Sequence, residues 1–400
     1  MKNKLYRYIL ISLSLTCAIF LTGCWDYMEI ERRGYILGIA IDLVEDKDVQ
    51  DKMQYMQTEV GVPTHLYTIQ LPILPNSSIK PSGQGAGGGQ DDKTWNLKIA
   101  GNSFFEVNRE YATILDYPAF YEHLKSIVIS EEAARKGIYD FTDFFMRDPE
   151  MRRRTRVFIT PGKAHKILEV DPKIEDYPSM SLRSLPSNAN RNSRMLHKTD
   201  LGRVITHLHS GNDFVLPKVI ASKTEIKNAG AAVFKKDKMV GWIDEIQTNY
   251  LKWISGYAEG GTITIESPDN PSKQVCLEMK NLKTDVKPVV HGEEITFNIN
   301  VKANFNIVEV NHGHHKRVFE EEFIKEVKRI AEKKAEKQMR ETIEFVQKEY
   351  GTDIFFFYQV MQRYAPDTWD KVEKDWDSIF PKVKTNINVN IKIDQIGLIK

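Results

Sequence analysis

A long one-sided helical pattern near the C-terminus constrains the fold of this 400-residue chain most strongly. Between residues 317 and 350, apolar side chains recur every three or four positions, and Glu and Lys occupy most positions between them. The apolar positions are Phe319, Phe323, Val327, Ile330, Ala331, Ala335, Met339, Ile343 and Val346. This spacing predicts a long helix with one apolar stripe, which must be buried against another element.

Two segments on either side of this helix show the alternation that is typical of half-buried strands. Apolar and polar residues alternate through residues 294–310 and 383–393, as in strands that bury one face. We therefore predict that residues 271–400 form a domain in which an antiparallel sheet packs against the long helix. A coiled coil is the alternative for the helix, but its wide stripe and the adjacent strands favour packing inside the domain.

The preceding residues indicate two further domains. Strand and helix patterns alternate through residues 24–185, which is typical of a mixed α/β domain. A stretch rich in Pro, Ser, Asn and Arg extends from residue 177 to about residue 198, and we place a domain boundary at residue 185 within it. Residues 186–270 then form a middle domain with this linker, two helices and a hairpin. The patterns together predict an α+β, or mixed α/β, protein of three domains, as the length suggests.

The N-terminus has the composition of an export signal. Lys2, Lys4 and Arg7 precede an uncharged apolar run over residues 8–21. This run is shorter than the roughly 20 residues of a membrane-spanning helix, so we predict that residues 1–23 are a signal peptide. These features alone also fit an ordinary signal peptide, in which Cys24 would merely be the next residue.

The last residues of this signal favour a lipoprotein. The run ends in Leu21-Thr22-Gly23-Cys24, which has the form of a bacterial lipobox. Small residues before the cysteine let the chain enter a peptidase in extended form. We predict cleavage after Gly23, an S-diacylglycerol group on the Cys24 thiol and an N-palmitoyl group on its new amino terminus.

Charge and cysteine content exclude several classes of protein. The whole chain has 56 basic and 55 acidic residues. Without the signal peptide, 53 basic and 55 acidic residues remain, so the net charge of the mature chain is −2. This balance argues against a strongly basic nucleic-acid-binding protein. Three cysteines in the chain exclude a disulfide framework, and Cys276 is predicted to be a packed strand residue rather than a nucleophile.

Three other segments have both a functional and a structural interpretation. The Gly-rich insertion at residues 82–90 lacks the Gly-Lys-Ser/Thr of a phosphate-binding loop, which favours a flexible surface insertion. His312, His314 and His315 could bind zinc, but no Cys or helical His pair completes a site, so a solvated turn is favoured. The basic run at residues 152–156 is either the solvated start of a strand or a contact for anionic headgroups or an acidic partner.

No motif for catalysis is present in the sequence. The Gly-x-Ser-x-Gly and His-Glu-x-x-His patterns are missing. We therefore predict no catalytic residue, no cofactor and no metal site, and the sequence assigns no residue to a ligand.

Several stretches in the same order resemble the Ger(x)C family, the lipoprotein C subunits of spore germinant receptors. The resemblance begins at Gly-Cys-Trp-Asp, residues 23–26, and continues through the apolar strand 34–42 that ends in Ile-Asp. It includes residues 137–152 and the hairpin at 230–242, and covers some 375 residues. The insertion at 82–90 departs from the family pattern.

The resemblance implies a non-enzymatic subunit that is lipid-anchored on the outer face of the cytoplasmic, or inner spore, membrane. Its partners would be two integral-membrane germinant receptor subunits, of the A type and the transporter-like B type, in a complex that starts germination in response to nutrients. Only Cys24 carries over as a functional position. The alternatives are a solute-binding lipoprotein of an importer and an exported lipid-anchored hydrolase.

Overall fold

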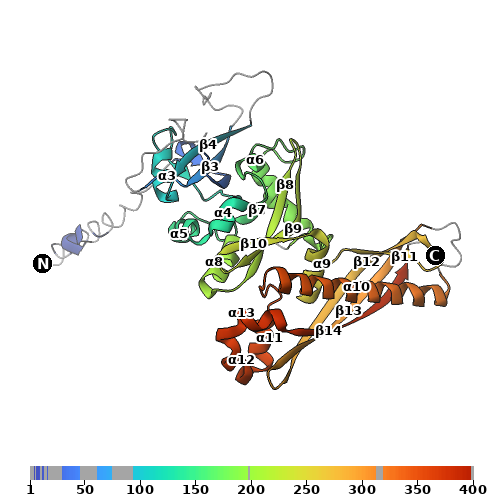
Figure 1. Cartoon of the computed structure of the whole chain (residues 1–400). Helices are drawn as coiled ribbons and strands as arrows, with labels where there is room; N and C mark the ends of the chain where they lie inside the picture. The colour runs from blue at the N-terminus through green and yellow to red at the C-terminus, as the bar shows by residue number, and fades with distance from the viewer. Residues whose placement is uncertain are drawn as a thin grey trace.

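A computed structural model describes residues 29–45, 61–73, 93–196, 199–311 and 319–397, together with scattered positions between 4 and 16. Cys24, the Gly-rich insertion and the His312–His315 cluster lie outside the described residues. The body contains two large sheets with helices packed on them (Figure 1). Within the described part of the chain, no helix has both the length and the apolar character that crossing a bilayer requires.

The first sheet has eight strands in the order β10-β9-β8-β7-β6-β2-β3-β4. Its central neighbours β2, β6, β7 and β8 are parallel, and the outer pairs on both sides are antiparallel. The strands are β2 (Gly38–Leu43), β3 (His65–Pro72), β4 (Thr94–Gly101), β6 (Ser126–Ser130), β7 (Arg156–Thr160), β8 (Phe214–Ala221), β9 (Ile226–Lys235) and β10 (Lys238–Ile243). A separate parallel pair joins β1 (Gly34–Tyr35) to β5 (Ala119–Phe120).

Helices cover both faces of this sheet. In β2, Ile39 and Ile41 belong to one apolar core, whereas Ala40 belongs to another on the opposite face. Successive side chains of a strand point to opposite faces of the sheet, and here both faces are covered. The strand is therefore a continuous apolar run rather than an alternating one. The first face holds α3 (Phe104–Tyr111), α4 (Glu131–Lys136), α5 (Tyr139–Arg147) and α8 (Leu201–Ser210), and the second holds α6 (His165–Leu168) and α7 (Pro178–Ser184). The 3-10 helix η2 (Leu185–Asn190) follows α7.

The first sheet joins strands that the sequence patterns divide between two domains. β8, β9 and β10 lie in the predicted middle domain, yet they extend the sheet of the first domain through the β7–β8 pairing, Ile159 to Lys218. Residue 185 is therefore not a boundary between sheets, and the three-domain division of the chain stays a prediction. Hydrophobic patterns locate strands but do not specify which strands pair.

The second sheet packs against the long helix, which confirms the predicted α+β arrangement. Its strands β11 (Thr262–Ser267), β12 (Asn270–His291), β13 (Glu294–Val310) and β14 (Lys384–Ile396) lie in chain order. The predicted stripe of α10 (Glu321–Glu349) is buried from Phe323 to Val346 except for Ile330, which is half-buried, whereas Phe319 precedes the helix and is exposed. The strands β11, β12 and β13 are antiparallel, but β14 is parallel to β13 because a helical crossover connects them. The crossover comprises α10, α11 (Phe357–Tyr364), α12 (Pro366–Val372), η4 (Glu373–Asp375), α13 (Trp376–Ile379) and η5 (Phe380–Lys382).

Polar side chains of α10 bond to both edges of this sheet. The backbone N–H groups of Val389 and Ile391 on β14 donate to Glu336 and Glu332 at 3.0 and 2.8 Å. On the opposite edge, Lys334 Nζ donates to the Thr264 carbonyl oxygen of β11 at 2.7 Å. Unpaired edge groups invite pairing with another chain, and these charged side chains occupy them.

The end of α10 also ties the second half of the molecule to the first sheet. The Tyr350 hydroxyl donates to the Trp242 carbonyl oxygen at 2.8 Å and accepts from the Trp242 N–H at 3.1 Å. β10 is an edge strand of the first sheet, so Tyr350 satisfies its free backbone groups. A side chain at the adjacent Gly241 would meet the tyrosine ring, because a Cβ there would lie 2.3 Å from Tyr350 Cε1.

We predict that Gly241→Ala lowers the free energy of unfolding by about 1–3 kcal/mol, since the new methyl group must displace the Tyr350 ring. Urea denaturation followed by circular dichroism would measure the loss. Gly162→Ala is the matched control, because a Cβ at Gly162 has no heavy atom within 4 Å. The cost of Gly241→Ala should shrink in a Tyr350→Ala background. An equal cost in both backgrounds would contradict the proposed contact.

Candidate functional site

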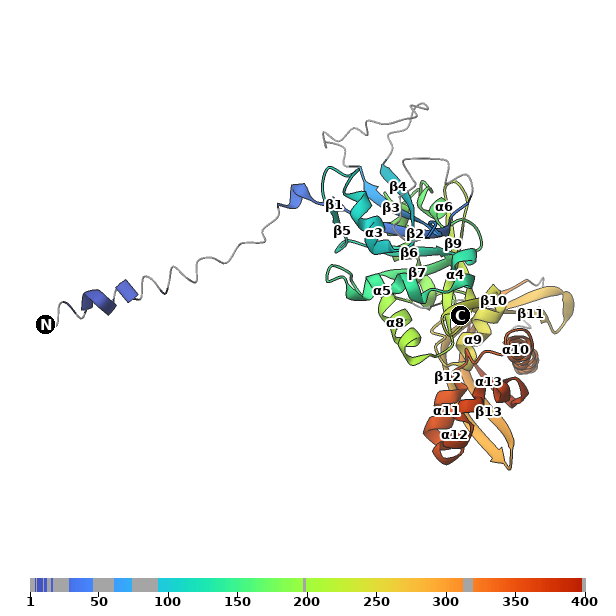
Figure 2. The same cartoon turned by 60° about the vertical axis from the view of Figure 1, so that its left-hand side comes forward.

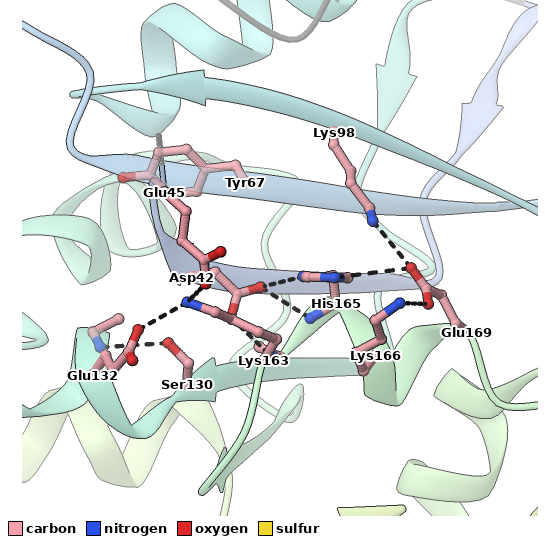
Figure 3. A network of polar contacts seen from close by, with 12 residues as sticks. Asp42, Glu45, Tyr67, Lys98, Ser130, Glu132, Lys163, His165, Lys166 and Glu169 are labelled. Atoms are coloured by element: carbon pink, nitrogen blue, oxygen red, sulfur yellow. Dashed lines mark hydrogen bonds and ion pairs between the residues drawn. The ribbon is translucent and has the colours of Figure 1, made fainter. Parts of the chain in front are cut away.

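A network of polar contacts lies around Asp42 in β2 (Figure 3). This side chain is fully buried. Its carboxylate accepts from the backbone N–H groups of Ala164 and His165 at 2.6 and 3.0 Å, and it contacts His165 Nδ1 at 2.9 Å. A buried carboxylate needs such partners, and here they are the first N–H groups of α6.

The opposite end of α6 is held by amide side chains of the same sheet. Gln70 Nε2 on β3 donates to the Leu168 carbonyl oxygen at 2.7 Å, and Asn96 Nδ2 on β4 donates to the same oxygen at 3.0 Å. The Ser179 hydroxyl of α7 donates to Gln70 Oε1. Asp42, Gln70 and Asn96, which we call the α6 clamp, therefore hold both ends of a one-turn helix that has few hydrogen bonds of its own.

Charged side chains surround the clamp. Lys163 Nζ lies 2.7 Å from Glu45 Oε1 and 2.9 Å from Glu132 Oε2. Partial burial acts to raise the pKa of the Glu169 carboxyl, but hydrogen bonds from Lys166 and Lys98 outweigh it and lower this pKa. The two Nζ atoms lie 2.7 and 3.0 Å from the carboxylate oxygens. These ion pairs connect β4, the loop after β2 and α4 to the segment that carries α6.

The Asp42–His165 pair resembles the orienting half of a catalytic triad. In a triad, the second ring nitrogen of the histidine, Nε2, would accept a proton from a nucleophile, so the contacts of His165 Nε2 decide whether the pair could act in this way. His165 Nε2 lies 4.0 Å from a Glu169 carboxylate oxygen. Within the described ranges, no Ser, Thr or Cys side chain hydrogen-bonds to this nitrogen. The geometry therefore supports a structural clamp rather than an activated nucleophile.

The structure separates the other residues that the sequence singled out. Cys276 is a half-buried free thiol on β12, with Sγ 3.8 Å from Thr264 Oγ1. Two histidines near the end of α8, whose spacing makes a ligand pair improbable, are also apart in their contacts: His207 stacks on Phe214 at 5.2 Å between ring centroids, whereas His209 is exposed and lies 3.3 Å from the Met146 sulfur. Among the residues described, no three His, Cys, Asp or Glu side chains gather as a metal site.

Sequence patterns did not reveal the α6 clamp. Asp42 and His165 are 123 positions apart, and no motif links them. The one local signal is an aspartate within an otherwise apolar buried strand, which must find a buried partner.

Comparison with known proteins identifies two adjoining regions of one family. The family model described as spore germination protein N-terminal domain matches residues 26–221. The model described as spore germination B3/GerAC like, C-terminal, matches residues 229–397. The chain belongs to the Ger(x)C family of spore germination proteins. The first region ends with β8 and the second begins within β9, so both contribute strands to the eight-stranded sheet.

Two curated relatives and one solved structure extend this result. The chain is 28% identical to spore germination protein YndF of Bacillus subtilis (strain 168) over 413 residues, which cover 100% of both chains. It is 27% identical to spore germination protein B3 of the same organism over 384 residues, or 95% of each chain. The crystal structure of the GerBC protein has the same fold, with a TM-score of 0.58 at 22% identity over 89% of this chain and 96% of that chain.

We predict that Asp42→Ala lowers the free energy of unfolding by roughly 2–4 kcal/mol, because two buried backbone N–H groups and His165 lose their acceptor. Chemical denaturation would measure this loss. Asp116→Ala removes an exposed aspartate from the same part of the chain and should change stability by less than about 0.5 kcal/mol. Equal effects of the two substitutions would refute a role for Asp42 in holding α6.

Proposed function

We propose that this Ger(x)C protein is a lipid-anchored, non-catalytic subunit of a nutrient germinant receptor that acts in spore germination. A lipobox that ends at Cys24, directly before a chain that matches the family from residue 26, carries this proposal. The anchor would hold the body on the outer face of the cytoplasmic, or inner spore, membrane. Two or three buried acyl chains suffice for stable attachment, since each buried CH₂ contributes about 0.8 kcal/mol.

The proposed partners are two integral-membrane receptor subunits, of the A type and the transporter-like B type. Family membership supports this assignment. The polar cluster around Asp42 supports a non-catalytic role, because its groups bind to one another and to backbone. An exported hydrolase would need a reactive group free to meet substrate.

The importer alternative requires two similar lobes around a cleft. The two halves of this molecule differ, since one has an eight-stranded mixed sheet and the other a four-stranded sheet around a long helix. This difference favours a receptor subunit over a solute-binding lipoprotein. Co-purification from detergent-solubilised spore membranes distinguishes the two: receptor subunits would support the proposal, and importer subunits alone would overturn it.

We predict that Cys24→Ala abolishes acylation and weakens nutrient-triggered germination, because only this thiol follows the lipobox. Metabolic labelling with an alkyne fatty acid would report acylation directly. Cys276→Ala is the matched control, since it removes the other cysteine of the mature chain and should leave labelling unchanged. If the Cys24→Ala protein still incorporated the fatty-acid label, the proposal that Cys24 carries the anchor would be overturned. If spores with unlabelled Cys24→Ala protein germinated fully, the anchor would not be needed for germination.

A further inference from the structure

Three consecutive arginines project from a fixed turn before β7. Met151 and Thr155 are buried at the two ends of the turn, and Arg152, Arg153 and Arg154 between them are exposed. The Thr155 N–H donates to the Arg152 carbonyl oxygen at 3.0 Å, and its hydroxyl donates to the Leu124 carbonyl oxygen at 3.3 Å. The three charges are therefore presented outward by a pinned backbone.

Other cations approach this turn, and few acids balance them. Arg152 pairs with Glu122 at 2.6 Å, but Arg153 and Arg154 have no ion pair among the described residues. Burial, together with the charges of Arg183 and Arg154, lowers the pKa of Lys125. Like charges held together destabilise the fold unless an anion joins them.

This group of cations lies where the N-terminal segment joins the body. The Arg33 guanidinium carbon lies 4.2 Å from the centre of the Phe120 ring, which lies 5.9 Å from the His123 ring. His123 follows Glu122, the partner of Arg152. These contacts link Arg33, which directly precedes β1, to Arg152. Figure 2 shows β1 beside β5 at the left-hand margin of the body.

We propose that Arg33, Lys125, Arg152, Arg153 and Arg154, which we call the basic cluster, bind the phosphates of anionic phospholipids. This inference rests on the proposed anchor, because acylated Cys24 would place the cluster at the bilayer. Five peptide units separate Cys24 from Glu29, and each spans at most about 3.6 Å, so the described body begins within roughly 18 Å of the anchored residue. Guanidinium groups bind phosphate through paired hydrogen bonds.

The charge distribution favours a lipid surface over an acidic protein. The mature chain has a net charge of −2, so attraction to an anionic surface must come from a local patch. A short tether keeps this patch near the bilayer, where lipid phosphates surround it, whereas the proposed partner subunits occupy only part of that surface. Each basic residue close to an anionic membrane strengthens binding roughly fivefold, and salt weakens the effect.

Vesicle flotation of residues 25–400, which retain every described element from residue 29 onward, would test the cluster without acylation. We expect binding to phosphatidylcholine vesicles that contain phosphatidylglycerol, weakened in about 500 mM salt, and little binding to phosphatidylcholine alone. The triple substitution Arg152→Gln, Arg153→Gln and Arg154→Gln should weaken binding at least about tenfold. Lys328→Gln, Lys333→Gln and Lys337→Gln on α10 remove the same charge elsewhere and should change it less than about twofold.

Equal losses in the two triple variants would overturn the proposal, because net charge alone would then explain binding. So would equal binding to neutral vesicles. If the arginine variant bound vesicles normally but no longer co-purified with membrane subunits from spores, the cluster would bind an acidic protein instead. Failure of Cys24 acylation is scored separately by fatty-acid labelling, so the two proposals fail independently.

Discussion

The buried carboxylate of Asp42 is the constraint on which the first sheet most depends. It has no access to water, so its charge must be balanced by donors within the protein. Those donors are the first N–H groups of α6 and the ring of His165, which places α6 over β2. Amides of β3 and β4 hold the other end of the helix, and the apolar core on that face closes beneath it.

A second constraint is that the backbone groups of the edge strands need hydrogen-bond partners. The edge strand β10 receives hydrogen bonds from Tyr350 and from Arg135, whose Nη1 lies 3.1 Å from the Val240 carbonyl oxygen. Side chains of α10 occupy the edges of β11 and β14. The polar flank of the long helix therefore does more than face solvent. Covered edges resist unwanted strand pairing, which suits a protein proposed to work within a complex.

Local pattern predicted most single elements of the fold. The stripe of α10, the alternation in β13 and β14, and the hairpin β9–β10 all appear as expected. The strands β4 and β8 were not predicted, and the helix α7 lies in the stretch interpreted as a linker. The alternation of Trp95, Leu97 and Ile99 in β4 is present in the sequence, whereas Pro217 interrupts the pattern of β8 and α7 has only seven residues. The parallel pairing of β14 follows from the crossover and not from its own residues.

The residues to which we assign a role also divide into those that sequence patterns identify and those that only the tertiary structure brings together. The proposed acylation of Cys24 rests on the sequence alone, because a signal peptidase reads a short extended segment and not a fold. Family membership also follows from the sequence, through many modest matches in one order. Only the tertiary structure brings His165 to Asp42, and Arg33 to the surface that carries Arg152. Such groups meet because sheet topology brings distant segments together, and no local pattern records that distance.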